Sequence, residues 1–526
     1  MMSKPASASI INILNTFAIT NLDQELISKT LSNLSGDLVN DSRLVIQGDI
    51  FCAIVGHAQD GRRYINKAIT QGAKLVLAEC EYAEQHGEIS FVDNISVISF
   101  YQLNLQLFSL SSAYYQNPQS KMTMIGVTGT NGKTTTSQLI AQMLTAYSKA
   151  CGVIGTNGAG PINQLLPIEN TTPSASELHQ LFYRFEQEQL SHVAMEVSSH
   201  ALVQGRVTGD LFDVAVFTNL SRDHLDYHGT MLGYAKAKKA LFTGEEKQIA
   251  IFNFNDEQVK YWLAEDVKAG LSIKQHWFYG LDKSVLTCEK FVCAQKVKHH
   301  HQGVSFTLMT HIGEVFIESP LLGDFNIENL LAAISVLLTQ GVALKDLPSL
   351  TKKIHAVAGR MEATTGLSLP TAVVDYAHTP DALEKALTAC RQHCQGELYV
   401  VFGCGGDRDK GKRPLMAKVA QQYADYIVIT NDNPRTEIAE QIVEDILAGF
   451  TKKKSLEHKI KVQLDREQAV LDTLIKASQQ DIVLLAGKGH EDYVIFPDGQ
   501  GGTKKVAYDE RAVVSKFYHL KHETQL

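Results

Sequence analysis

A glycine-rich loop with a lysine lies between an apolar strand pattern at 124–127 and a helical pattern at 134–147. The loop reads Gly129-Thr130-Asn131-Gly132-Lys133-Thr134-Thr135. Its glycines let backbone N–H groups turn toward a phosphate, Lys133 can contact β- and γ-phosphates, and the Thr134 hydroxyl can bind Mg²⁺. The helix N-terminus adds partial positive charge. Val127 replaces the usual first glycine, and the alternative is a glycine-rich turn with a chance lysine. The strand–loop–helix order favours ATP binding.

A second group of polar loops follows four buried strand patterns in the last third of the chain. The strands are expected at 372–375, 398–402, 426–429 and 482–485, with helical segments between them. This order predicts a parallel α/β sheet, whose ligands bind at the carboxyl ends of the strands. The loop residues expected to converge there are Arg408, Asp432, Asn433, Pro434, Arg435, and the run Gly487, Lys488, Gly489, His490 and Glu491.

The charges in these loops indicate what they could bind. Two arginines match planar carboxylates, and Glu491 matches an ammonium. An amino acid with two carboxylates and a free distal amine fits this set, whereas L-lysine would leave Arg435 unpaired at a cost of about 1–3 kcal/mol. The alternative is that Arg435 only caps or salt-bridges a loop.

Length and composition limit the wider possibilities. The chain has 526 residues, of which 44% are hydrophobic and 20% charged, so we expect a globular protein of three or four domains. A net charge of -8 argues against a general nucleic-acid binder. Eight dispersed cysteines predict reduced thiols. The longest uncharged run, 94–120, is broken by Asn and Gln, and we read the N-terminal segment as mature sequence. We expect a cytoplasmic protein without a membrane segment.

Three stretches divide the chain by pattern, and we predict domains at 1–120, 121–360 and 361–526. The first has strand patterns at 50–55 and 74–78 around a helix at 64–71 that ends at Gly72. The second begins with the glycine-rich loop and continues with strands at 193–197, 214–217 and 249–252. The third holds the four strand–loop units.

The form G-T-N-G-K-T-T resembles the ATP-dependent Mur ligase family, and further motifs follow in that family's order. They are Asp41-Ser42-Arg43, Gly56-His57, Asp60-Gly61, Asn170-Thr171-Thr172-Pro173, MEVSSHAL at 195–202, FTNLSRDHLDYHGTM at 217–231, YAKAKKALF at 234–242, Gly323 with Phe325-Asn326, and Gly359-Arg360-Met361-Glu362. The resemblance covers residues 40–511 and implies an α/β protein of three domains. These are an N-terminal UDP-binding domain, a central P-loop ATPase domain with a mostly parallel sheet and a C-terminal Rossmann-like domain.

What the resemblance implies is amide formation through carboxylate activation. ATP would phosphorylate a glutamyl carboxylate of the substrate, and an amine would then displace phosphate. The implied catalytic residues are Lys133, Glu196, His224, Lys238 and Arg360, and Asn329 and Arg360 join the loop at ATP. Thr134, Glu196 and His224 would hold Mg²⁺. Taken alone, Glu196 could be a surface carboxylate and His224 a structural histidine.

Lys238 has two interpretations. As one of three lysines on a polar helix, it would normally be exposed to solvent. The resemblance implies instead a lysine converted by CO₂ to a carbamate, an anion with two oxygens that suits binding of Mg²⁺.

The resemblance also implies the two other substrates. Residues implied at UDP-N-acetylmuramoyl-L-Ala-D-Glu are Asn40, Ser42, His57, Ala58, Gln59, Asn170, Thr171, Thr172, Ser198, Gln204 and Arg206. The D-N-P-R tetrad at 432–435 resembles the subgroup that adds meso-2,6-diaminopimelate, in peptidoglycan precursor synthesis. These three small molecules would be the partners of a monomer, with no nucleic acid or membrane.

Other functions have to be weighed against this one. A folylpolyglutamate synthetase or a lysine-adding ligase is the rival within the family, and the tetrad and the first domain argue against both. A P-loop switch or mechanical ATPase would not need the polar loops of a separate α/β domain. The histidines at 299–301 have no assigned role, and we read them as part of a solvated loop.

Overall fold

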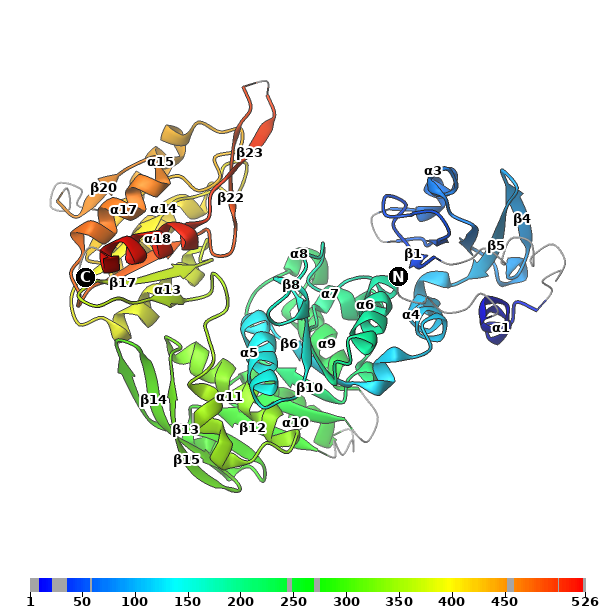
Figure 1. Ribbon diagram of the computed structural model, residues 1–526, viewed down its shortest axis with the longest axis horizontal. Coiled ribbons are helices and arrows are strands. Elements are labelled where there is room, and N and C mark those ends of the chain that lie inside the picture. Colours follow the sequence, from blue (N-terminus) through cyan, green and yellow to red (C-terminus); the bar gives the residue numbers. More distant parts are fainter. Residues whose placement is uncertain are drawn as a thin grey trace. The chain divides into compact units, whose positions relative to one another are not determined.

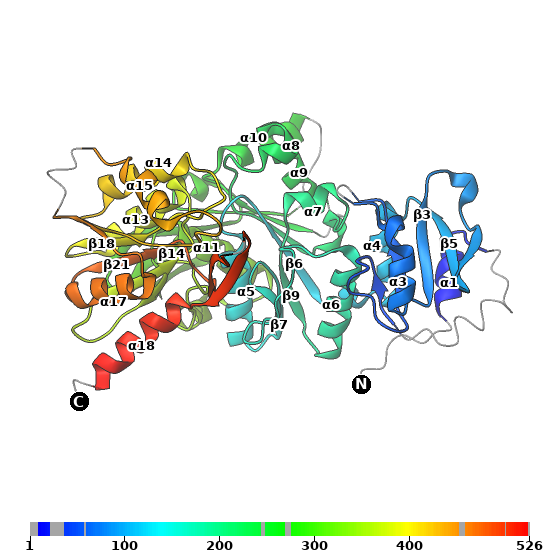
Figure 2. The same cartoon turned by 90° about the horizontal axis from the view of Figure 1, so that it is seen from above.

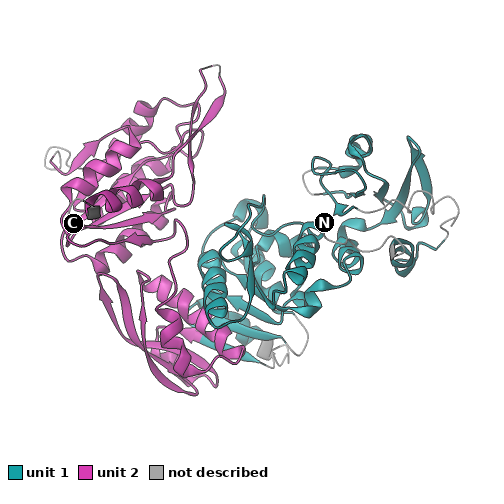
Figure 3. Ribbon diagram, in the orientation of Figure 1, with its two compact units in different colours: residues 1–278 teal, residues 279–526 magenta. Residues whose placement is uncertain are grey.

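Short apolar strands alternate with helices along most of the chain, and the predicted strands are confirmed. The computed structural model describes residues 9–20, 36–56, 59–243, 248–268, 275–451, 458–499 and 501–523. It divides into two compact units, residues 1–278 and 279–526, which are described separately (Figure 3).

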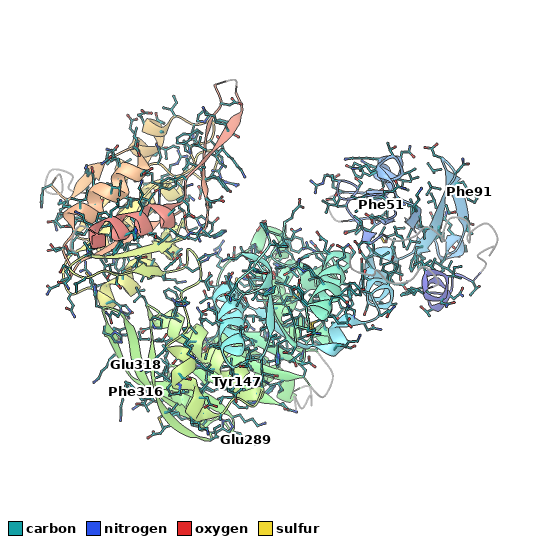
Figure 4. The ribbon with its side chains drawn as sticks, viewed as in Figure 1. Phe51, Phe91, Tyr147, Glu289, Phe316 and Glu318 are labelled. Atoms are coloured by element: carbon teal, nitrogen blue, oxygen red, sulfur yellow. The ribbon has the colours of Figure 1, made fainter. Side chains whose placement is uncertain are left out.

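Unit 1 begins with a five-stranded sheet in the order β1-β2-β3-β5-β4. Its elements are α1 (Ser9–Thr16), β1 (Leu38–Val39), β2 (Ile50–Ala53), α3 (Ile65–Gln71), β3 (Leu75–Cys80), β4 (Ile89–Val92), β5 (Ile95–Tyr101) and α4 (Leu103–Tyr114). Helices α1 and α4 cover one face and α3 the other (Figures 1 and 2). Phe51 on β2 is 1% exposed, whereas Phe91 on the edge strand β4 is 51% exposed (Figure 4).

The second part of unit 1 carries the glycine-rich loop. Its elements are β6 (Thr123–Thr128), α5 (Lys133–Ala146), β7 (Cys151–Gly155), β8 (Gly158–Pro161), α6 (Ala175–Gln187), β9 (His192–Glu196), α7 (Ser199–Val203), β10 (Val214–Phe217), α8 (Leu225–His228), α9 (Met231–Lys239), β11 (Ile249–Asn253) and α10 (Glu257–Lys268). The strand order is β11-β10-β6-β9-β7-β8, and all pairs are parallel except β7 with β8. Helices α5 and α6 lie on opposite sides of β6 and β9 (Figure 1).

Unit 2 begins with antiparallel strands and continues with a parallel sheet. Strand β12 (His276–Gly280) contains the unit boundary, and β13 (Phe291–His300), β14 (Gly303–Thr310) and β15 (Gly313–Ser319) form a meander. On β15, Phe316 and Glu318 are two residues apart and therefore share a face (Figure 4). Helices α11 (Asp324–Thr339) and α12 (Leu347–Thr351) follow.

The second sheet of unit 2 has the order β16-β17-β21-β18-β19-β20 and is parallel except for the edge pair β16 with β17. Its elements are β16 (Glu362–Thr364), β17 (Thr371–Asp375), α13 (Pro380–His393), β18 (Leu398–Phe402), α14 (Lys412–Tyr423), β19 (Tyr426–Ile429), α15 (Ala439–Leu447), β20 (Ile460–Val462), α17 (Arg466–Lys476) and β21 (Ile482–Ala486), followed by the hairpin β22 (Tyr493–Pro497) and β23 (Thr503–Ala507) and by α18 (Glu510–Glu523). Helices α13, α14 and α15 cover one face, and α17 and α18 cover the other. The four predicted polar loops therefore leave from one edge of one sheet.

The cysteines and the helix lengths bear on two further features of the chain. All eight cysteines, each within the described ranges, are free thiols as predicted. Within the described ranges, no helix is long and apolar enough to cross a membrane.

Candidate functional site

The glycine-rich loop connects β6 to α5 as predicted, and its polar groups contact one another. Lys133 Nζ donates to the carbonyl oxygens of Gly129 and Thr130, at 2.9 and 3.0 Å. Gly129 has φ +150°, and a methyl group there would overlap Thr218 Oγ1. Glycine is required at this position both for the backbone conformation and for the space. The loop backbone is also tied to β10 through Thr130 N, which donates to Asn219 O at 2.8 Å.

Lys238 is buried, with 1% of its surface exposed, although its helix looks polar in sequence. Its Nζ donates to Gly129 O at 2.7 Å and lies 4.5 Å from the ring centre of Tyr234. Desolvation, with a further contribution from the charge of Lys133, holds the pKa of Lys238 well below its usual range. The expectation of an exposed lysine is wrong, and the amine lies directly against the glycine-rich loop.

Glu196 is 1% exposed at the end of β9, so the alternative of a surface carboxylate is wrong. Its Oε2 accepts from Thr134 Oγ1 at 2.9 Å, and its Oε1 accepts from Thr156 N at 2.7 Å. The hydroxyl and carboxylate oxygens of Thr134 and Glu196 are ligands that suit Mg²⁺.

His224 differs from Thr134 and Glu196 because its side chain is largely exposed. It precedes α8 with φ +52°, and 46% of its side chain is exposed. Its ring packs edge-on against His200 at 5.0 Å and Tyr234 at 6.0 Å. In the parts of the chain that are described, no group of three His, Cys, Asp or Glu side chains forms a metal cluster. The predicted magnesium set therefore depends on Thr134 and on a modified Lys238 as well as on Glu196.

The residues predicted at the muramyl dipeptide gather around Glu196. Thr172 Oγ1 donates to Glu196 O at 2.8 Å and accepts from Ser198 N at 3.0 Å. Arg206 Nη1 donates to Thr172 O at 2.8 Å, and Arg206 Nε donates to Gln204 Oε1 at 2.8 Å. Burial lowers the pKa of Arg206.

Thr171 joins the same network through Thr156, since their hydroxyl oxygens are 3.1 Å apart. Asn170 is exposed on the preceding turn. Five of the six predicted residues are thus brought together by hydrogen bonds, and Asn170 stands beside them in sequence.

The residues predicted at the uridine end are only partly described. Asn40 Oδ1 accepts from Ser174 Oγ at 3.0 Å and from Ser176 Oγ at 2.9 Å, so this side chain ties β1 to the start of α6. Ser42 is 7% exposed, and Gln59 Oε1 accepts from Tyr64 Oη at 2.7 Å. His57 and Ala58 lie outside the described residues.

Asn329 and Arg360 belong to unit 2. Asn329 is buried on α11, where its Nδ2 donates to Asn326 Oδ1 at 3.2 Å. The Arg360 guanidinium lies 4.8 Å from the ring centre of Tyr376, which also packs against His490 at 5.3 Å. Arg360 is therefore placed at the edge where the β17 and β21 loops leave the sheet.

The loops predicted to bind an amino acid do converge. A methyl group on Gly405 would lie 2.8 Å from Arg435 Nη1 and 3.7 Å from Arg408 Cγ, so the two arginines flank this glycine. Arg435 has φ +53°, and its Nη1 donates to Gly406 O at 2.8 Å. A methyl group on Gly487 would lie 3.7 Å from Asp432 Oδ2. Loops after β18, β19 and β21 thus meet at one place.

Acidic and amide groups line the other side of this junction. Asn433 Nδ2 donates to Glu491 Oε2 at 2.9 Å, and the buried Lys488 Nζ lies 3.1 Å from Asp432 Oδ1. Burial alone would raise the pKa of Asp432, but the charges of Lys488 and Arg466 outweigh it and hold that pKa below its usual range.

The histidines at 299–301 do not form the solvated loop we expected. His299 and His300 lie on β13, and His299 Nε2 is 2.8 Å from Asp324 Oδ1. His301 is in the following turn, with Nε2 2.9 Å from Thr371 Oγ1. The prediction is wrong because His299 and His300 belong to a strand and the rings of His299 and His301 find partners that are distant in sequence, although His300 is exposed.

The sequence reasoning did not identify Thr156, and it placed Lys488 in a converging loop without giving it a role. Thr156 contacts Glu196 and follows β7 in the turn Gly155-Thr156-Asn157-Gly158, a strand-to-turn signal like those of the other loops. Lys488 lies between two glycines of the loop after β21, and its loop position was the available signal.

The fold and site define an α/β protein of the P-loop type. Residues 127–337 match the Mur ligase middle domain, and residues 359–489 match the Mur ligase, glutamate ligase domain. Relatives from two strains of Haemophilus influenzae are 43% identical over 482 residues, which is 91% of this chain and 96% of each relative. Both are named UDP-N-acetylmuramoyl-L-alanyl-D-glutamate--2,6-diaminopimelate ligase. The chain belongs to the Mur ligase family.

Solved structures agree with this assignment. One named as a UDP-N-acetylmuramoyl-L-alanyl-D-glutamate--2,6-diaminopimelate ligase has TM-score 0.67 at 33% identity, covering 92% of this chain and 95% of that chain. MurF from Acinetobacter baumannii has TM-score 0.58 at 18% identity, covering 88% and 94%. A folylpolyglutamate synthase of Mycobacterium tuberculosis has TM-score 0.57 at 18% identity, covering 73% and 92%. The last two show the fold alone. The predicted family, α/β fold class and enzyme class, a ligase, are confirmed.

Proposed function

We propose that this chain adds meso-2,6-diaminopimelate to the D-glutamate of UDP-N-acetylmuramoyl-L-Ala-D-Glu, with conversion of ATP to ADP and phosphate. The names of the relatives at 43% identity support this substrate pair. The observation that carries the proposal is the loop junction in unit 2, called the amino-acid pocket below, where Arg408 and Arg435 flank Gly405 and Glu491 is bonded to Asn433. Two guanidinium groups and a carboxylate match an amino acid with two carboxylates and a distal ammonium.

The reaction proceeds by activation of a carboxylate. An oxygen of the D-glutamate side chain attacks the γ-phosphorus, the bond to the β-phosphate oxygen breaks and ADP leaves. The neutral amine of diaminopimelate then attacks the acyl carbon, the C–O bond to phosphate breaks and the amine proton passes to solvent. Lys133 and Arg360 are the cations that offset the charge of the approaching anions.

Magnesium would be held by the oxygens of Thr134 and Glu196, together with His224. The ion supplies charge that neutralises the transferring phosphoryl group. Thr156 N keeps the second oxygen of Glu196 in place, since it donates to Oε1 at 2.7 Å. The carboxylate is thereby oriented with Oε2 toward Thr134.

We propose that Lys238 carries a carbamate. The neutral amine attacks CO₂, a C–N bond forms and a proton is released, so the reaction requires an uncharged lysine. Burial and the nearby Lys133 lower the pKa of Lys238 and favour that uncharged form. The resulting anion would place two oxygens beside Lys133 and the phosphate loop.

The remaining assignments follow from the same proposal. We propose substrate-binding, ATPase and amino-acid-binding domains at 1–120, 121–360 and 361–526; the middle-domain match, 127–337, falls within the second, and the match at 359–489 begins two residues before the third. The dipeptide contacts would be made by Thr171, Thr172, Ser198, Gln204 and Arg206, with Asn170 beside them, and the uridine contacts by Asn40, Ser42 and residues 57–59. We propose a cytoplasmic monomer that acts on small molecules, without nucleic acid or membrane partners.

Phosphate release tests the proposed reaction. The assay supplies UDP-N-acetylmuramoyl-L-Ala-D-Glu, ATP and Mg²⁺ with either meso-diaminopimelate or L-lysine, and mass spectrometry identifies the product. We expect release only when the nucleotide dipeptide and diaminopimelate are both present. Equal turnover with lysine would contradict the amino-acid assignment, and steady release without either substrate would indicate a P-loop ATPase of another kind.

A further inference from the structure

Lys488 is a fully buried cation that the chemistry of the reaction does not itself require. It follows β21 and has 0% of its side chain exposed. Its Nζ donates to Asn433 Oδ1 at 2.8 Å, to Tyr493 O at 3.0 Å and to Glu491 Oε2 at 3.2 Å. An ammonium has three N–H donors, and these three partners together with Asp432 Oδ1 at 3.1 Å leave none of them for a substrate. Lys488 therefore acts on other side chains of the pocket rather than on a substrate.

Asn433 is the first of these side chains. Its Oδ1 accepts from Lys488 Nζ and also from Ile495 N at 2.9 Å, which fills both lone pairs of the oxygen. The amide can then have only one orientation, with Nδ2 facing Glu491 Oε2 at 2.9 Å. Within the described part of the chain, the second N–H of Asn433 Nδ2 has no acceptor and can donate to a ligand.

Strand β22 couples this arrangement to the arginine side of the pocket. Ile495 N holds Asn433, and Ile495 O accepts from Arg435 N at 3.0 Å. Lys488 holds the same strand through Tyr493 O. The Asn433 amide and the Arg435 backbone are thus both bonded to β22.

The charge balance gives Lys488 a second effect. Asp432 and Glu491 both lie within hydrogen-bond distance of its ammonium, at 3.1 and 3.2 Å. Two carboxylates and one ammonium leave a net charge of -1, which matches a single ligand ammonium. Without Lys488, the two neighbouring carboxylates would lose the ammonium that lies between their charges.

We propose that Lys488 is the positioning residue of the amino-acid pocket. It orients Asn433, donates to one oxygen of Glu491 and cancels one of the two carboxylate charges. The other oxygen, Glu491 Oε1, is then left for the distal ammonium of diaminopimelate. This inference rests on the proposed function, since that function supplies diaminopimelate as the ligand.

Kinetics of Lys488→Met test the positioning role. The KM for diaminopimelate should rise about 10- to 100-fold, because charge-assisted hydrogen bonds of the pocket are lost. The KM values for ATP and the nucleotide dipeptide should stay within about twofold, since their proposed contacts are made by other residues. Val483→Ala, in the core of β21, is the matched control. It should lower the melting temperature and leave the KM for diaminopimelate unchanged.

A double-mutant cycle separates positioning from general damage. If Lys488 acts through Glu491, then Lys488→Met combined with Glu491→Gln should raise KM by much less than the product of the two single effects. Lys488→Gln keeps a donor to Asn433 without the charge, and it should recover part of the lost affinity. This variant also serves if the Met variant does not fold.

The two proposals can fail separately. If the wild-type enzyme uses diaminopimelate but neither Lys488 variant changes its KM, the positioning role is wrong. Fully multiplicative effects in the cycle would also overturn it. If the wild-type enzyme does not use diaminopimelate, the proposed function is wrong instead.

Discussion

The phosphate loop of unit 1 and the amino-acid pocket of unit 2 both lie at the carboxyl ends of parallel strands, but they are held in different ways. The phosphate loop is one continuous segment, residues 129–135, in which Lys133 donates to carbonyls of the same loop and the buried Lys238 amine donates to Gly129 O. The pocket comes from three loops separated by up to 86 residues of chain, and buried cations hold it together. These are Lys488 and Arg413, both with 0% side-chain exposure.

This difference has consequences for ligand binding. A phosphate must replace bonds that Lys133 already makes to its own loop, so its binding exchanges one set of partners for another. The pocket needs little rearrangement, because Lys488 and Ile495 fix the Asn433 amide before a ligand arrives. We therefore expect substitutions near the phosphate loop to affect turnover, and substitutions in the pocket to affect affinity.

The largest effect should come from Lys238→Ala beside the phosphate loop. We expect turnover to fall by at least about 10³-fold, because the carbamate proposed for Lys238 cannot form. ATP should still bind, since the loop backbone and Lys133 stay in place. Phosphate release and calorimetric titration with ATP measure the two quantities.

A control and a rescue sharpen this test. Lys239→Ala removes the next lysine, which is paired with Glu265 at 3.4 Å, and should leave turnover nearly unchanged. Added short carboxylic acids should restore part of the activity of Lys238→Ala if a carbamate is what was lost. Near-normal turnover of the variant would remove the carbamate from the mechanism.

The next largest effect should come from Arg435→Ala in the pocket. Loss of a charge-assisted contact to a carboxylate costs about 1.5–3 kcal/mol, which corresponds to a rise of roughly 10- to 150-fold in KM for diaminopimelate. The KM for ATP should hardly change. Arg511→Ala, which removes a surface ion pair with Asp509, is the control. An equal loss of affinity for both ligands would count against the assignment.

The same contrast explains what the sequence could and could not predict. The phosphate loop and the strands of both units were readable because each signal lies within one short segment. Contacts between loops were not readable, since Lys488 is 55 residues from Asn433 and Thr156 is 40 residues from Glu196. Burial of Lys238 was likewise hidden, because its helix shows lysines on several faces. The histidines at 299–301 were misread for the same reason, since their partners are distant in sequence.

A smaller effect should follow from Gly155→Ala in the metal region. A methyl group at Gly155 would overlap Glu196 Oε1, so the carboxylate must turn away from Thr134. We expect the Mg²⁺ concentration for half-maximal phosphate release to rise about tenfold, as for loss of a group that orients a metal ligand. Val153→Ala on the same strand should leave the Mg²⁺ dependence unchanged. An unchanged dependence in Gly155→Ala would show that Glu196 does not orient the ion.

The smallest effect should come from Glu437→Gln, which tests whether charge holds the pocket loops. Glu437 accepts from Arg413 at 2.9 and 3.0 Å, and Arg413 also donates to Gly405 O at 3.3 Å. The hydrogen bonds from Arg413 lower the pKa of Glu437 to about 2. Because this pKa lies below its unfolded value of 4.5, the stabilisation is complete above about pH 4.5 and is lost as pH falls toward 2.

At pH 7 this substitution should therefore lower the melting temperature by roughly 2–4 °C, the shift expected for a loss of about 1 kcal/mol. The difference from wild type should shrink as the pH falls below 4.5, since the wild-type carboxylate then takes up a proton. Both tryptophans, Trp262 and Trp277, lie in unit 1, so their fluorescence reports that unit while calorimetry reports both. Glu444→Gln, on the exposed face of α15, is the control. If charge stabilises the loops of unit 2 but not the phosphate loop of unit 1, the melting temperature measured by calorimetry should fall and the one measured by tryptophan fluorescence should not. An equal fall in both melting temperatures would contradict the contrast between the two regions.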